Sequence, residues 1–311
     1  MKCRVCRGPA IIDLRRHNAG FCKEHFVVHC VEQVRRAIHD HTMIAAGERV
    51  LVAVSGGKDS LALWDLLIDL GYDTDGLYVG LGIDEYSDES LRCARAYAAP
   101  RELQLHVVDL AADHGFTIPA AAAVTHRAPC GACGLSKRHV FNAFAVDHDY
   151  DVIATGHNLD DEAAVLLGNV LRWETGYLGR QRPVLPAAPG FARKVKPLVR
   201  VGEREMAAYC IVRGIDYQVE ECPMSAGNRH LGFKELLNDL EQRSPGSKAA
   251  FVSSFFTRGQ PHFEGEAVEE RKELTACEEC GSPTTGEICA FCKLRERAQM
   301  PVTLNASRPR H

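Results

Sequence analysis

The 311-residue sequence lacks the features that mark membrane proteins and strongly basic proteins. No apolar run approaches the 18 residues that a membrane helix needs, and no cationic leader with an apolar core opens the sequence. The formal net charge is −4, so an RNA contact would have to come from a local cationic patch. We therefore expect a cytoplasmic protein with no membrane segment and with one main domain that carries appendages.

The sequence has a glycine-rich turn that is not the GxxxxGK[ST] phosphate loop, because its two glycines are adjacent and the lysine follows directly. A buried strand is predicted over 50–54, and Ser55-Gly56-Gly57-Lys58-Asp59-Ser60 leads from it into a helix. Glycine lets the backbone approach a ligand, and the N–H groups of a new helix attract an anion. Ser55, Lys58 and Ser60 add donors, and Asp59 could hold Mg²⁺ between phosphates. The strand and helix on either side favour a phosphate site over an ordinary βα turn.

Strands alternate with helices along the middle of the chain. Strands are predicted over 50–54, 75–79, 104–109, 151–155 and 215–219, and helices over 26–46, 60–70, 88–99, 133–148, 160–172 and 203–213. This order predicts an α/β fold with a doubly wound, mostly parallel, Rossmann-like sheet that binds ligands at the carboxyl ends of its strands. Residues 110–129 lose the pattern and could form a mobile lid, whereas 228–256 predicts two helices separated at Ser244-Pro245-Gly246.

Ten of the thirteen cysteines fall into three groups. Two of these groups have the spacing of closed tetrahedral Zn²⁺ sites, with four protein ligands each: Cys3, Cys6, Cys22 and His25 near the N-terminus, and Cys277, Cys280, Cys289 and Cys292 near the C-terminus. We therefore expect an N-terminal zinc knuckle over 1–28, a catalytic domain over 29–262 and a C-terminal zinc knuckle with a tail over 263–311. Cys30, Cys93 and Cys210 fit buried structural thiols, and His17 and His29 fit bystanders of the first knuckle.

The third group is Cys130 and Cys133, which open a predicted helix, together with the distant Cys222. Their positions suggest three cysteines meeting at the nucleotide site. A thioredoxin-like redox pair and a structural zinc completed by a histidine are the alternatives. Another strand end carries Gly156-His157-Asn158-Leu159-Asp160-Asp161. One of the two aspartates can cap the following helix, which leaves the other available for metal or acid–base work.

A cationic segment over 179–200 contains six basic residues and no acidic one. Its prolines keep it extended, so it could present cations to RNA phosphates; a solvated loop is the alternative. The predicted RNA-binding residues are Arg180, Arg182, Arg193, Lys194, Lys196 and Arg200.

The sequence resembles the tRNA 2-thiouridine synthetases of the TtuA type. The resemblance is carried by four features together: the SGGKDS turn, the cysteine trio, the GHNxDD segment and a cysteine knuckle at each end. The resemblance covers nearly the whole chain and fits best the branch that thiolates the T-loop 5-methyluridine. It implies a PP-loop domain that binds ATP through Ala53, Ser55, Gly56, Gly57, Lys58, Asp59, Ser60 and Gly156.

The same resemblance implies that Cys130, Cys133 and Cys222 hold a [4Fe–4S] cluster and that Lys137, Asp161 and Asp59 are catalytic. It further implies that the C2 oxygen of the uridine is adenylated and then replaced by sulfur, and that the sulfur donor is a ubiquitin-like protein with a C-terminal thiocarboxylate. ATP, Mg²⁺, two Zn²⁺ ions and the cluster are thus the expected cofactors, and tRNA is the expected partner. A persulfide on one cysteine is an alternative to the cluster, and the sequence leaves open whether the chain forms a homodimer.

Three other functions remain as alternatives. Thiolation of the wobble uridine would use the same chemistry and most of the same motifs. An amide-forming PP-loop ligase would need neither the cysteine trio nor RNA. A zinc-built RNA-binding module without catalysis is disfavoured by the intact Lys58, Asp59 and Ser60.

Overall fold

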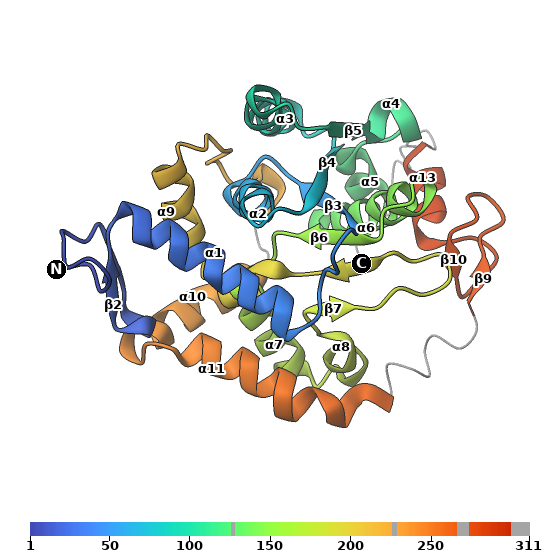
Figure 1. Ribbon diagram of the computed structural model, residues 1–311. Helices are drawn as coiled ribbons and strands as arrows, with labels where there is room; N and C mark the ends of the chain where they lie inside the picture. The colour runs from blue at the N-terminus through green and yellow to red at the C-terminus, as the bar shows by residue number, and fades with distance from the viewer. Residues whose placement is uncertain (126–127, 226–228, 266–273, 300–311) are drawn as a thin grey trace, which may run out of the picture.

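A six-stranded sheet forms the centre of the computed structural model, which describes residues 1–125, 128–225, 229–265 and 274–299 (Figure 1). The strand order is β5-β4-β3-β6-β8-β7. The bounds are β3 Arg49–Val54, β4 Asp73–Gly80, β5 Leu105–Asp109, β6 Val152–Thr155, β7 Val184–Leu185 and β8 Arg193–Val195. Neighbouring strands run parallel except for β7, which is antiparallel to β8. The predicted doubly wound, mostly parallel sheet is confirmed.

Helices cover both faces of this sheet because the strand side chains alternate between two cores. Val50, Val52 and Val54 of β3 lie in one buried cluster with side chains of α1 (Lys23–Asp40), α2 (Lys58–Asp69) and α9 (Glu203–Arg213). Leu51, between them, lies in another cluster with Ala145 of α6 (Pro129–Asp147). In Figure 1, α1, α2 and α9 accordingly lie on one side of the sheet and α6 lies on the other.

The remaining helices surround this core. They are α3 (Asp84–Ala98), α4 (Leu110–His114), α5 (Ile118–Thr125), α7 (Leu159–Arg172), α8 (Thr175–Arg180), α10 (Arg229–Arg243) and α11 (Ser247–Ser254). The predicted break between α10 and α11 is confirmed, with Gly246 at a φ of 96° before α11. Helices α7, α10 and α11 pack on one another below the sheet in the view of Figure 1. Among the described residues, no helix has the length and apolar character needed to cross a membrane.

The structure corrects three sequence-based predictions. The strand predicted over 215–219 does not form: Val219 is 78% exposed, and the Gln218 N–H donates to the Gly56 carbonyl at 2.9 Å, outside any strand ladder. The strand that pairs with β6 on its outer side is β8, from the cationic segment. Residues 110–129, where the sequence pattern of strands and helices is lost, are in fact helical over α4, α5 and the start of α6.

The third correction concerns α1, which ends at Asp40 rather than continuing to residue 46. Thr42 has a φ of 50°, and the Met43 N–H donates to the Ile38 carbonyl at 2.9 Å, which closes the helix end in the manner of a Schellman turn. Met43 and Ile44 are buried, so the chain leaves the helix in order to place these side chains in the core.

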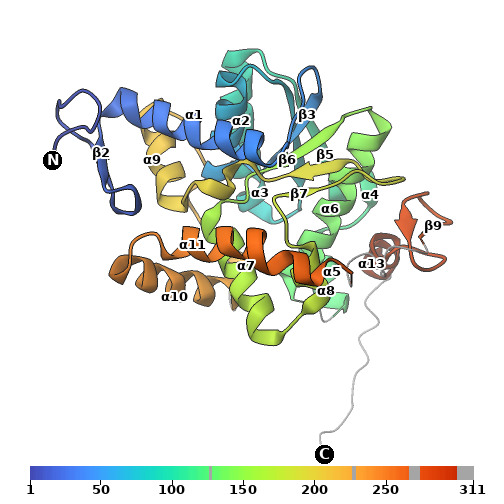
Figure 2. The same cartoon turned by 60° about the horizontal axis from the view of Figure 1, so that its bottom comes forward.

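The two cysteine knuckles lie at opposite ends of the molecule (Figures 1 and 2). The first contains β1 (Ile12–Leu14), the short 3₁₀ turn η1 (Arg15–His17) and β2 (Ala19–Phe21), and its chain continues directly into α1. The second contains β9 (Thr275–Ala276), β10 (Pro283–Thr284) and α13 (Ala290–Gln299), and α13 packs against α5 and α6. The acidic run at 266–273 and the tail at 300–311 lie outside the described residues.

Candidate active site

The glycine-rich turn lies where the strand order reverses. From β3 the chain adds β4 and β5 on one side, and then returns to place β6 on the other side of β3. The carboxyl ends of β3 and β6 therefore diverge into a crevice, the usual ligand position in open α/β sheets. Ser55–Ser60 follows β3, and Gly156–Asn158 follows β6, so both motifs found in the sequence meet at this crevice.

The turn is held by its own hydroxyl groups and by close backbone contacts. The Ser60 hydroxyl accepts from the Ser55 N–H at 3.0 Å and donates to the Gly57 carbonyl at 3.0 Å. Gly56 has a φ of 75°, and a Cβ there would lie 2.1 Å from the Ser90 carbonyl oxygen. A Cβ on Gly156 would lie 3.0 Å from the Ser60 nitrogen. Glycine is thus needed at Gly56 for both conformation and space, and at Gly156 for close approach.

A cavity of about 470 Å³ opens beside this turn. Lys137 and Asp161 line it. So do five of the eight predicted ATP-binding residues, which are Ala53, Ser55, Asp59, Ser60 and Gly156. Gly56 and Gly57 are not among its lining residues, and Lys58 instead lines a neighbouring cavity on the side of α9. The start of α2 adds N–H groups and the positive end of a helix dipole, which suit a phosphate.

Charged side chains form a closed ring at the edge of the cavity. Lys58 Nζ lies 3.1 Å from Asp59 Oδ2 and 2.8 Å from Glu203 Oε1. Lys234 Nζ lies 3.1 Å from Glu203 Oε2 and 2.6 Å from Asp161 Oδ1. Glu203 therefore holds two ammonium groups at once, one from the phosphate turn and one from α10.

The ring is completed through Asn158, which is fully buried. The Asn158 amide donates to Asp59 Oδ1 at 3.0 Å, and its backbone N–H donates to Asp161 Oδ2 at 3.1 Å. Asn158 Oδ1 accepts from the N–H of Asp161, so the two residues form a capping box at the start of α7. Asp161 thus caps the helix with one oxygen and faces Lys234 with the other.

The electrostatics of the ring follow from burial and charge. Burial alone would raise the pKa of Glu203, but Lys58 and Lys234 outweigh it and lower this pKa to about 2. Burial raises the pKa of Asp59, although Lys58 and Asn158 act in the opposite direction. Glu203 and Lys234 are absent from the residues predicted from the sequence, because a charged residue in a helical pattern carries no local sign of a partner far along the chain.

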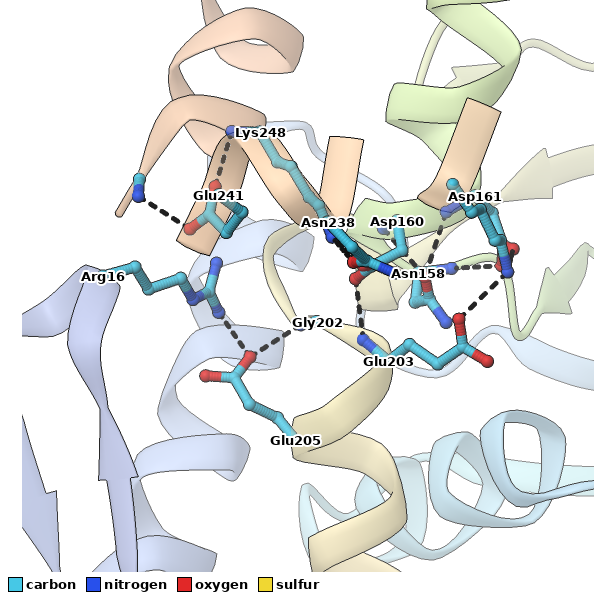
Figure 3. Close-up of polar contacts among 12 residues, drawn as sticks. Arg16, Asn158, Asp160, Asp161, Gly202, Glu203, Glu205, Asn238, Glu241 and Lys248 are labelled. Atoms are coloured by element: carbon cyan, nitrogen blue, oxygen red, sulfur yellow. Dashed lines mark hydrogen bonds and ion pairs between the residues drawn. The ribbon is translucent and has the colours of Figure 1, made fainter. Parts of the chain in front are cut away.

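Asp160 has a different role from its neighbour Asp161. It is buried, and its Oδ2 accepts from the backbone N–H of Glu203 at 2.8 Å, at the start of α9 (Figure 3). Its Oδ1 pairs with Lys248, which also contacts Asn238. Asp160 therefore fixes α9 and α11 against α7 and does not line the cavity beside the phosphate turn.

The cysteine trio lines a second cavity of about 230 Å³. Cys130 and Cys133 lie in the first turn of α6, and Cys222 precedes a short 3₁₀ turn. Ser55, Gly134 and Lys137 line both this cavity and the one beside the phosphate turn, so the two cavities are neighbours. Burial raises the pKa of Cys133, and Lys137, one turn further along α6, acts to lower it.

The trio differs from the two knuckles in how closely its sulfur atoms lie. Among the described residues, the four ligand atoms of each knuckle lie within 4.8 Å of one another, and the three sulfurs of the trio do not form such a group. A single tetrahedral Zn²⁺ ion needs its sulfurs about 3.8 Å apart, at a Zn–S length near 2.3 Å.

The knuckles have the geometry of tetrahedral metal sites. Cys6 Sγ lies 3.8 Å from Cys22 Sγ in the first, and Cys280 Sγ lies 3.7 Å from Cys289 Sγ in the second. These separations match the value of about 3.8 Å expected around Zn²⁺. Backbone N–H groups also donate to the second knuckle, as from Cys289 to Cys277 Sγ at 3.2 Å, which would stabilise thiolates.

Most cations of the segment 179–200 are engaged with carboxylates. These carboxylates lie outside the segment: Arg182 pairs with Glu264, Arg193 with Glu48, Lys196 with Glu162 and Arg200 with Asp40. Glu162 is only 2% exposed, so Lys196 neutralises a buried charge. Arg180 and Lys194 lie over the rings of Tyr177 and Phe191.

Two family models match the chain. Residues 2–27 match the N-terminal LIM domain of the 2-thiouridine synthetase TtuA, and residues 27–226 match the PP-loop domain.

Relatives match along nearly the full length. The tRNA-5-methyluridine(54) 2-sulfurtransferase of Thermus thermophilus is 49% identical over 94% of this chain and 91% of its own. That of Pyrococcus horikoshii is 43% identical over 94% and 93%. Among solved structures, this chain shares its fold with the U34-tRNA thiolase NcsA from Methanococcus maripaludis, a structure described with its [4Fe–4S] cluster. The TM-score is 0.78 at 24% sequence identity, and the match covers 97% of each chain. The predicted resemblance is confirmed, and the chain belongs to the TtuA family of PP-loop 2-thiouridine synthetases.

Proposed function

We propose that this chain is an ATP-dependent tRNA 2-sulfurtransferase that replaces the C2 oxygen of 5-methyluridine 54 with sulfur. The observation that carries the proposal is the pair of neighbouring cavities, one at the phosphate turn and one lined by the cysteine trio, which share Ser55, Gly134 and Lys137. Relatives up to 49% identical are named for 5-methyluridine 54, which favours this uridine over the wobble position.

The phosphate turn would activate the uridine. A uracil carbonyl oxygen is a poor leaving group, so the C2 oxygen attacks the α-phosphate of ATP and pyrophosphate departs. Backbone N–H groups at the start of α2 and the ammonium of Lys58 would stabilise the pyrophosphate, with Mg²⁺ held by Asp59. Sulfide then adds to C2, and the oxygen leaves within AMP, so that one C–O bond is exchanged for one C–S bond.

Lys58 and Lys234 are poised for phosphate in this scheme. Both ammonium groups are now bound to Glu203, and a triphosphate entering the cavity would offer them more negative charge than one carboxylate does. Lys234 lines the cavity itself, so we assign it to ATP binding along with the predicted residues.

The cysteine trio would supply the sulfur side of the reaction. A [4Fe–4S] cluster held by three cysteines has one iron without a protein ligand, which gives the incoming sulfur a place to bind. Lys137 lines both cavities, so its ammonium can stabilise negative charge that develops as sulfur meets the activated base. Asp161 would orient the base or move a proton.

Zn²⁺, tRNA and a sulfur-carrier protein complete the proposal. Each knuckle would hold one structural Zn²⁺, since four ligands leave no open position. The cationic segment, with Arg180, Arg182, Arg193, Lys194, Lys196 and Arg200, is the proposed tRNA phosphate contact, because it carries six basic residues and no acidic one. A thiocarboxylated ubiquitin-like protein is the proposed sulfur donor.

The test is Cys222→Ser in anaerobically reconstituted protein. We expect loss of iron and of tRNA thiolation together, with ATP binding and zinc content kept. A control, Cys93→Ser, changes a buried cysteine outside the trio and should keep iron and thiolation. Full thiolation by rigorously iron-free wild-type protein would exclude the cluster and leave the persulfide route.

A further inference from the structure

A third group of metal-ligating side chains lies between the first knuckle and the catalytic domain. It consists of His17 in η1, His29 in α1 and Glu205 in α9, and one ligand atom from each lies within 4.8 Å of the others. The Nε2 atoms of His17 and His29 lie 3.9 and 4.0 Å from Glu205 Oε1. Three segments far apart in the sequence thus direct polar atoms at one point.

These three atoms have no hydrogen-bond partner among the described residues. His17 Nε2, His29 Nε2 and Glu205 Oε1 are each buried from solvent. Separations of 3.9 and 4.0 Å are too long for hydrogen bonds between them. Buried polar atoms are normally satisfied, because leaving one without a partner costs about 1–3 kcal/mol. One group bound between the three atoms would satisfy all of them.

Glu205 is held so that one oxygen faces the histidines. Its side chain is 5% exposed, and its Oε2 accepts from Arg16 Nη2 at 2.5 Å and from the Gly202 N–H at 2.6 Å (Figure 3). Oε1 is left free of both donors. Hydrogen bonds of this kind commonly orient a ligating carboxylate.

The histidines are held as well. His29 stacks on Phe21 with ring centroids 4.8 Å apart, and the His17 ring meets His29 edge-on, also at 4.8 Å.

We propose that His17, His29 and Glu205 form a third divalent metal site, which binds Zn²⁺ through two imidazoles and one carboxylate. This ligand set leaves a fourth position for water, unlike the closed knuckles. The ligand separations exceed by about half an ångström those around tetrahedral Zn²⁺ with bonds near 2.1 Å, so the side chains close slightly on the ion.

Arg16 lowers the affinity of this site for a metal ion. Its positive charge on the same carboxylate opposes a cation, so the third ion binds more weakly than the two knuckle ions. The ion would join η1 of the knuckle to α9, whose first turn carries Glu203 of the charged ring. Its structural effect is therefore to fix the N-terminal knuckle against the domain that binds ATP.

The test is zinc content in the full-length protein, loaded with Zn²⁺ and freed of excess ion by gel filtration. Glu205→Gln and His29→Ala are expected to hold one Zn²⁺ per chain fewer than wild type. His39→Ala removes an exposed histidine from the same helix and should match wild type. His17→Gln, at the most exposed of the three positions, decides the matter if the other variants do not fold.

A second measurement uses wild-type protein alone. Titration with a chromogenic chelator should release one Zn²⁺ before the others, and Co²⁺ added back at one equivalent should give visible bands without the near-ultraviolet sulfur-to-cobalt charge transfer of a cysteine site. Equal zinc content in wild type and all three ligand variants would overturn the proposal and assign the central position to a buried water molecule. Release of all Zn²⁺ in a single phase would also count against it.

Discussion

The pair between Lys248 and Asp160 is expected to be among the most costly contacts to break in this protein. Their side chains are only 7% and 10% exposed. Lys248→Met removes the ammonium and leaves Asp160 Oδ1 buried without its countercharge. Breaking a buried ion pair from one side typically costs about 3–5 kcal/mol, because an uncompensated charge remains. We expect a loss of stability in that range.

The double variant Lys248→Met/Asp160→Asn separates charge from packing. The amide oxygen that this variant carries at position 160 can still accept from the Glu203 N–H, and no unpaired charge remains at the site. Replacement of a whole buried pair is often close to neutral, so the double variant should be more stable than Lys248→Met by about 2 kcal/mol or more. Lys23→Met changes an exposed lysine and should stay within about 0.5 kcal/mol of wild type.

The assay is urea unfolding of the zinc-loaded protein, monitored by circular dichroism and by fluorescence. The fluorescence signal should report the exposure of Trp64, which is fully buried in the folded protein. Stabilities are compared only where the two signals coincide and the urea dependence is unchanged. A loss below about 1 kcal/mol in Lys248→Met, or a double variant no more stable than the single, would refute the reasoning that charge burial dominates here.

Substitutions at four further positions test the site and the cationic segment. Asp59→Ala should abolish pyrophosphate release while zinc content stays at the wild-type value; release at the wild-type rate would remove Asp59 from the mechanism. Lys234→Met should weaken ATP binding by about tenfold, the effect of losing about 1.4 kcal/mol, and Lys234→Arg should restore most of it. Glu203 has a pKa lowered to about 2, so its stabilising contribution is full above pH 4.5 and is lost as the pH falls toward 2. The difference in unfolding free energy between wild type and Glu203→Gln should therefore stay constant from pH 8 to 5. A difference that varies in this range would contradict the ion-pair geometry. Lys194→Ala should lower the salt dependence of tRNA binding by about one counterion, and an unchanged slope would place Lys194 outside the interface.

The sequence predicts well those features that depend on neighbours in the chain. The phosphate turn, its strand and its helix all form where predicted, because glycine spacing and apolar runs act locally. The strand predicted over 215–219 fails because apolar alternation says nothing about whether a sheet edge is available. The sheet position beside β6 goes instead to Arg193–Val195, of which only Val195 is buried.

The same limit applies to the site. Asp59 and Asp161 are found from motifs, but their environment depends on Glu203 and Lys234, which are 144 and 175 positions beyond Asp59 in the numbering. The cationic segment shows the same limit. A run without acidic residues gives no sign of carboxylate partners elsewhere in the chain, yet Lys196 pairs with the buried Glu162, and Arg182, Arg193 and Arg200 also pair with carboxylates outside the segment.

Each knuckle contacts a helix that carries site residues, which the cysteine motifs alone do not indicate. The second packs α13 on α6, where Phe291 stacks on His139 with centroids 3.9 Å apart. Helix α6 also carries Cys130, Cys133 and Lys137.

The first knuckle reaches the site from the other end, through the ion pair of Arg16 with Glu205 on α9. Two residues earlier on α9, Glu203 holds Lys58 of the phosphate turn. Each knuckle therefore braces the helix behind one of the two neighbouring cavities. With the proposed Zn²⁺ bound, each knuckle would be stiffer than a loop of the same length, because its ligands could not move independently. One such unit behind each cavity would hold the phosphate turn and the cysteine trio at a fixed separation, although the helices that carry them, α2 and α6, lie on opposite faces of the sheet.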